Sequence, residues 1–239
     1  LNSKEAVDLA LKAIEQSSPV VESIKESQKE ISPRAPFSTS TLQQTAANRL
    51  GFTSRKTMQI AQQLYQGIDL GTERVGLITY MRTDSLRLSD TAINEVRDFI
   101  QKDYTDCLPI KAIRYDSKGR SQDAHEAVRP TFVTKKPKDL ENFLSKDQFR
   151  LYSIIWERFV ACQMLPQKLR TVTIDIKFGQ GVFRASSTDS VFDGFQAVLK
   201  ILSTKQKRVK LPKLKSNEKL LCDRLEPEQH FTTGPAQYT

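Results

Sequence analysis

The sequence has little cysteine and no long apolar run. Three of its 239 residues are cysteines, and none of them has C-x₂-C spacing. An odd number of isolated cysteines argues against a disulfide framework and a tetrahedral zinc site, and it fits a reducing compartment such as the cytoplasm. No stretch approaches the roughly 18 apolar residues of a membrane span, and the first residues lack a signal-peptide pattern. Secreted disulfide-rich, zinc-ribbon and membrane-spanning classes are therefore disfavoured.

Charge is plentiful and unbalanced. The chain has 37 lysines and arginines against 28 acidic residues, a net charge of +9 and an isoelectric point near 9.4. Such a balance suits a polyanionic partner, although many ordinary proteins share it. The length allows one large or two modest domains.

The segment Gly76–Asp84 reads GLITYMRTD and groups three useful side chains. Tyrosine is a poor nucleophile at neutral pH because the ordinary pKa of a phenol is about 10. It becomes useful where cationic donors hold the anion that it attacks. Arg82 suits that role, because a guanidinium matches phosphate oxygens, and Asp84 is placed to orient a neighbouring side chain. The simpler interpretation is a buried strand, with Tyr80 packed and Arg82 solvated.

A second segment, residues 122–131, reads QDAHEAVRPT and contains one of only two histidines. On a helical turn, His125 and Arg129 would share a face. Together with Tyr80 and an acid they would form a phosphate site. The alternative is a short capped helix with a solvated histidine, stopped at Pro130.

Apolar spacing, caps and breakers predict the elements. Helices are expected over Ser3–Gln16, Ser40–Gly51, Ser54–Gly67, from Ser89 onward, and Lys146–Met164. Strands are expected over Val20–Ile31, Gly76–Thr79, Thr171–Phe178, Val182–Ser187 and Leu220–Asp223, with a hairpin turn at residues 179–181.

These elements predict an α+β fold. Residues 1–38 plus 167–239 would form a β-rich domain from both chain ends, and residues 39–166 an inserted helical domain carrying Tyr80. The two helices after Ser40 resemble a helix-turn-helix. They would either face DNA through Arg49, Arg55 and Lys56 or simply pack together, and the pattern leaves both open.

The quoted segments resemble the type IA DNA topoisomerases, and among them the bacterial enzymes most closely. GLITYMRTDS and QDAHEAVRPT match the family, as do residues 35–65, APFSTSTLQQTAANRLGFTSRKTMQIAQQLY, and residues 225–239, LEPEQHFTTGPAQYT. Two departures are small: Arg34 stands where proline is common, and Gly234 replaces a proline.

The resemblance implies a mechanism. Tyr80 would attack DNA to give a 5′-phosphotyrosyl intermediate, Arg82 and Arg129 would bind phosphate, and His125 would contact it, oriented by Asp84. Strand passage and religation would relax negatively supercoiled DNA through single-stranded regions, without ATP. A monomer associated with the nucleoid is expected.

The resemblance also implies what this chain lacks. The family's Toprim domain holds Mg²⁺ with an acidic cluster, and no D-x-D-x-E pattern occurs here. We therefore expect a central fragment without its own metal or cofactor, inactive in relaxation, from an enzyme that uses Mg²⁺.

Two rivals differ in chemistry. Tyrosine recombinases also use arginine, histidine and tyrosine, but with H-x-x-R before the tyrosine, whereas here H-x-x-x-R follows it. The other rival is a non-catalytic, basic helix-turn-helix DNA-binding module in which Tyr80 is structural.

Overall fold

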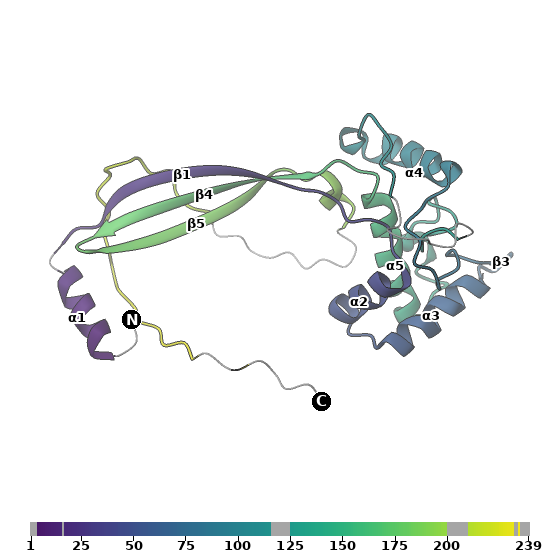
Figure 1. The fold of residues 1–239 in the computed structure, drawn as a ribbon, viewed down its shortest axis with the longest axis horizontal. Helices are drawn as coiled ribbons and strands as arrows, with labels where there is room; N and C mark the ends of the chain where they lie inside the picture. Colours follow the sequence, from purple (N-terminus) through teal and green to yellow (C-terminus); the bar gives the residue numbers. More distant parts are fainter. Residues whose placement is uncertain (1–3, 16, 116–124, 200–209, 232–233, 235–239) are drawn as a thin grey trace. The chain divides into compact units, whose positions relative to one another are not determined.

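The computed structural model describes residues 4–15, 17–115, 125–199, 210–231 and 234 (Figure 1). Its helices are α1 (Lys4–Glu15), α2 (Thr39–Leu50), α3 (Ser54–Gln66), α4 (Asp90–Asp103) and α5 (Lys146–Ala161), with 3-10 turns η1 (Thr105–Cys107), η2 (Pro137–Leu140) and η3 (Gly194–Ala197). Its strands are β1 (Val20–Ile31), β2 (Ile68–Asp69), β3 (Arg74–Val75), β4 (Gln167–Phe178) and β5 (Gly181–Phe192). The predicted α+β class is confirmed.

The chain divides into two compact units. One comprises Leu1–Gln28, Arg170–Asp189 and Lys207–Thr239, and the other comprises Lys29–Leu169 and Ser190–Gln206. The domain bounds predicted from the sequence stay a prediction, because compactness alone does not show that a segment is an independent domain.

The predicted hairpin is present in a sheet of order β1-β4-β5. Two residues, Gly179 and Gln180, join β4 to β5, and so short a connection requires antiparallel strands. Gly179 has φ +60°, a left-handed conformation that favours glycine. The apolar alternation along β4 is reflected in the burial of Ile174 and Phe178.

Asp175, the residue after Ile174 in β4, is also buried. The Asp175 carboxylate accepts two hydrogen bonds from Arg184 across the hairpin, at 2.7 and 3.2 Å, and one from Ser23 of β1 at 3.3 Å. Lys25 lies 4.0 Å away. The Arg184 hydrogen bond outweighs desolvation and lowers the pKa of Asp175, so the carboxylate links all three strands in ionised form.

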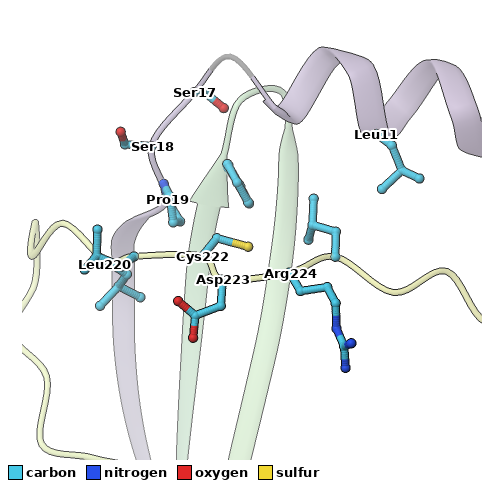
Figure 2. A pocket seen from close by; sticks show the side chains of 11 residues that line it. Leu11, Ser17, Ser18, Pro19, Leu220, Cys222, Asp223 and Arg224 are labelled. Atoms are coloured by element: carbon cyan, nitrogen blue, oxygen red, sulfur yellow. The ribbon is translucent and has the colours of Figure 1, made fainter.

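The predicted strand over Leu220–Asp223 is wrong. Only one bridge forms there, between Val20 and Lys219, and the Leu220 amide donates to the Pro19 carbonyl at 2.8 Å. Pro19 has no N–H to continue such a ladder. Figure 2 shows the following residues running past a pocket that Leu11, Pro19 and Cys222 help to line.

The helical unit is built around α5, which contacts α2, α3 and α4. Its core includes Leu42, Leu64, Ile100, Ile155 and Phe159. Ser89 and Ser145 cap α4 and α5 as the sequence pattern predicts. The cap of α2 is Ser38, two residues before the predicted start at Ser40, and Thr53, not Ser54, caps α3. The predicted ends Ser3 and Gln16 of the first helix lie outside the described residues. Within the described ranges, no helix is long and apolar enough to cross a membrane.

Replacing Asp175 by asparagine should destabilise the sheet at neutral pH. Because the folded pKa of Asp175 is lowered, its ionised form adds stability above the unfolded pKa of about 3.9. That contribution is lost as the pH falls through the folded pKa. Asp175→Asn should therefore lower the thermal unfolding midpoint at pH 7, by an amount that shrinks below about pH 4. Calorimetry across this range, with Glu26→Gln on β1 as control, checks it, and equal midpoints at pH 7 would contradict it.

Candidate active site

Three segments that are distant in sequence meet at Tyr80. Residues 35–39, 76–85 and 125–131 are joined by isolated bridges between Phe37 and Val128 and between Ile78 and Pro130. The amide of Thr79 donates to the Arg129 carbonyl at 2.9 Å, and that of Thr131 to the Leu77 carbonyl at 3.0 Å. These are the segments that the sequence analysis singled out.

Two local predictions are wrong. Residues 76–79 form no continuous strand, because β3 ends at Val75 and only Ile78 makes a bridge. Residues 125–131 form no helical turn; their backbone is bonded to residues 37 and 77–79 instead. Tertiary pairing has overridden the local helical spacing of His125 and Arg129. Gln122, Asp123 and Ala124 lie outside the described residues.

Burial alternates strictly along residues 80–85. Met81, Thr83 and Ser85 are buried, whereas the residues between them are exposed. Tyr80, Arg82 and Asp84 are therefore all exposed to solvent, although no regular strand contains them.

The Tyr80 ring lies at the surface between two other rings. It is 38% exposed, with the Tyr65 centroid at 5.4 Å and the His125 centroid at 5.8 Å. By contrast, Tyr152 is fully buried and donates its hydroxyl to the Lys135 carbonyl at 2.7 Å. Tyr80 is placed where a large substrate can reach its phenol, and His125 is beside it.

Arg82 and Asp84 are exposed and have no ion pair with a described residue. No hydrogen bond joins Asp84 to His125 in the described part of the chain, and the orienting role of Asp84 stays a prediction. No described carboxylate occupies the donors of Arg82.

Arg129 is held differently. It makes two hydrogen bonds to Glu126, at 3.1 and 2.7 Å, and one to the Pro130 carbonyl at 3.0 Å. Glu126 also accepts from the Ser89 amide at the start of α4. Burial acts to raise the pKa of Glu126, but these hydrogen bonds and the charge of Arg129 outweigh it and lower the pKa. This ion pair anchors the segment that carries His125.

Two of the three basic residues expected to face DNA from the helix-turn-helix form ion pairs within the protein. Arg49 pairs with the fully buried Glu157 of α5 at 3.3 Å, and Lys56 pairs with Asp147 at 2.7 Å. Arg55 is exposed. α2 and α3 pack on α5, so a DNA contact through Arg49 or Lys56 would compete with these pairs.

Support for the site comes from α5. Arg158 donates to the Ala35 carbonyl at 3.2 Å and lies over the Phe37 ring at 4.3 Å. Burial, with the charge of nearby Arg34, lowers the pKa of Arg158 to about 10. The contacts hold the segment that pairs with Val128.

Sequence reasoning missed several residues that shape the site. The Thr79 hydroxyl donates to the Ala127 carbonyl at 2.8 Å and accepts from the Arg129 amide at 3.0 Å. The Thr39 hydroxyl bonds to the backbone of residues 81 and 83. No periodicity signals such bonds, because their partners are more than forty residues away.

Comparison with known proteins identifies the family of the chain. The DNA topoisomerase family profile matches residues 1–239. The chain is 51% identical over 238 residues to DNA topoisomerase 1 of Treponema pallidum (strain Nichols), covering 99% of this chain and 33% of that protein. The chain belongs to the type IA DNA topoisomerase family.

A solved structure is similar as well. Full-length topoisomerase I from Thermotoga maritima matches with a TM-score of 0.72 and 36% identity, over 88% of this chain and 34% of that one. This topoisomerase chain thus spans about a third of the length of both relatives.

The described part of the chain offers magnesium no acidic cluster. Within it, no group of three or more histidine, cysteine, aspartate or glutamate side chains is arranged to hold a metal ion. Mg²⁺ usually takes one or two carboxylates together with water and phosphate oxygens. We derive no chemical step through the metal.

Gly76 should tolerate no side chain. A β-carbon there would lie 2.7 Å from the Tyr65 carbonyl oxygen, a backbone atom that cannot rotate away. Gly76→Ala should cost about 1–3 kcal/mol of unfolding free energy, by overpacking. Denaturant unfolding checks it against Gly234→Ala, whose β-carbon would meet nothing within 4 Å. Equal stability of the two variants would refute the steric argument.

Proposed function

We propose that this chain carries the nucleophile of a DNA topoisomerase, which cleaves one DNA strand transiently, passes a strand through the gap and reseals it. The observation that carries the proposal is the exposed Tyr80 phenol beside His125, with an exposed Arg82 two residues further along the chain. Membership of the type IA family supports the same assignment.

The reaction is a transesterification. The Tyr80 hydroxyl oxygen attacks the phosphorus of a phosphodiester in single-stranded DNA and forms a P–O bond. The P–O3′ bond breaks, and the proton lost by the phenol is balanced by the hydroxyl formed at the 3′ oxygen. A 5′-phosphotyrosyl link results. Attack by the 3′-hydroxyl reverses the step, so resealing needs no ATP.

Arg82, His125 and Arg129 have different roles in this proposal. Arg82, whose donors no described carboxylate occupies, binds the phosphate and its developing charge. Loss of one such donor typically costs on the order of 10²–10³ in rate. His125 contacts the same phosphate, with Asp84 orienting it once DNA is bound. Arg129 adds positive potential, although Glu126 holds its guanidinium.

We infer the substrate from the exposure of the Tyr80 phenol. A phenol at the surface reaches a strand whose backbone is free of its partner, and negatively supercoiled DNA offers such regions. We infer a monomer that acts on DNA in the cytoplasm, associated with the nucleoid, and an intact enzyme that uses Mg²⁺ held outside the described residues. Arg49, Arg55 and Lys56 are proposed secondary contacts to the DNA backbone, with Arg55 the most accessible.

Tyr80→Phe should abolish covalent capture. The substitution removes only the attacking oxygen and keeps the ring between Tyr65 and His125. In a full-length enzyme that includes this chain, a radiolabelled single-stranded oligonucleotide should be trapped by the unmodified protein and not by the variant. Tyr65→Phe is the matched control. Capture by Tyr80→Phe would favour the non-catalytic DNA-binding module, and a 3′-phosphotyrosyl link would favour a recombinase.

The chain alone should not relax supercoiled DNA. Within its described residues no acidic cluster is available for Mg²⁺, which the family resemblance places in a separate domain. Incubation of negatively supercoiled plasmid with Mg²⁺ should leave it unrelaxed by this chain, whereas a full-length enzyme should relax it. Efficient relaxation by the chain would show that the metal requirement is wrongly assigned.

A further inference from the structure

The side chain of Thr39, in α2, holds the backbone on both sides of Arg82. The Thr39 hydroxyl donates toward the Met81 and Thr83 carbonyls, at 2.7 and 3.1 Å, and accepts from the Thr83 amide at 2.8 Å. The Thr39 amide donates to the same Thr83 carbonyl at 2.9 Å. Both peptide groups that flank Arg82 are thus bonded to Thr39.

These hydrogen bonds of Thr39 take the place of regular secondary structure. The chain bends at Met81 and Arg82, and residues 81–89 belong to no helix or strand. Within the described part of the chain, Arg82 makes no ion pair. The backbone that Thr39 holds sets the position of the Arg82 Cα atom and the direction in which its side chain leaves the backbone.

Thr39 is itself firmly placed. It is the first residue of α2, whose start is closed by a capping box between Ser38 and Thr41. The opposite end of α2 closes at Gly51, with φ +70°. Because α2 is capped at both ends, the hydrogen bonds of Thr39 fix the backbone at residue 82 relative to α2.

We propose that Thr39 is a positioning residue for Arg82, which aims the guanidinium at the phosphate beside Tyr80. The inference rests on the proposed function, because it needs Arg82 to bind the phosphate that Tyr80 attacks. Thr39 touches no substrate in this proposal. Its hydroxyl supplies the bonds to the Met81 carbonyl and the Thr83 amide, so a methyl group of the same shape cannot replace it.

The test compares Thr39→Val with Thr39→Ser in a full-length enzyme that includes this chain. Valine keeps the branched shape and leaves the Met81 carbonyl and the Thr83 amide without their partner, whereas serine keeps the hydroxyl. Thr39→Val should slow cleavage of a single-stranded oligonucleotide about tenfold to a hundredfold. Thr39→Ser should stay within about threefold of the unmodified enzyme.

A double-mutant cycle separates positioning from a general loss of structure. If Thr39 acts through Arg82, then Thr39→Val should slow cleavage no further once Arg82→Ala is present. Thr57→Val is the matched control, since among the described residues the Thr57 hydroxyl makes a local bond, at 2.9 Å to the carbonyl of Thr53, which caps α3. Rates are measured well below each variant's unfolding midpoint.

Each outcome is decisive. Cleavage by Thr39→Val at the unmodified rate, a Thr39→Ser loss as large as that of valine, or equal losses with and without Arg82 would overturn the positioning role. If the unmodified enzyme traps no DNA, or Tyr80→Phe still does, the proposed function fails instead.

Discussion

Residues 76–85 run through the core and reach the surface without forming a helix or strand, so their backbone groups need partners from elsewhere in the chain. Threonine hydroxyls supply several of these partners. Those of Thr39, Thr79 and Thr131 bond to carbonyls 42, 48 and 55 residues away, at Met81, Ala127 and Gly76. The juxtaposition of Tyr80, Arg82 and His125 depends on this web of long-range hydrogen bonds.

Packing decides which side chains this irregular segment presents. Leu77, Ile78 and Met81 are almost completely buried, and their burial orients the chain so that Tyr80 faces outward. Apolar burial stabilises each such side chain by about 1.5–3 kcal/mol. The hydrogen bonds determine which residues of the segment lie opposite its partners. The buried apolar side chains keep the other side of the segment, with Tyr80, facing solvent.

Charge pairing separates the basic residues into two kinds. Arg129, Arg49 and Lys56 each have a carboxylate partner; that of Arg49, Glu157, is fully buried, and that of Arg129, Glu126, is partly buried. Arg82 has none among the described residues and lies two residues from the exposed phenol. A cation without an internal partner in an exposed position is available to an anionic ligand, and the net charge of +9 adds long-range attraction for a polyanion.

Local patterns were enough for the elements with strong periodicity or caps. The alternation of β4, the Gly179 turn and the capping serines of α4 and α5 act between neighbouring residues, so the sequence by itself determined them. Tertiary structure alone decided that His125 lies beside Tyr80, that its segment is extended, and that Glu126 holds Arg129. Those outcomes depend on hydrogen bonds and ion pairs whose partners come from different elements, and local spacing carries no information about which distant groups will meet.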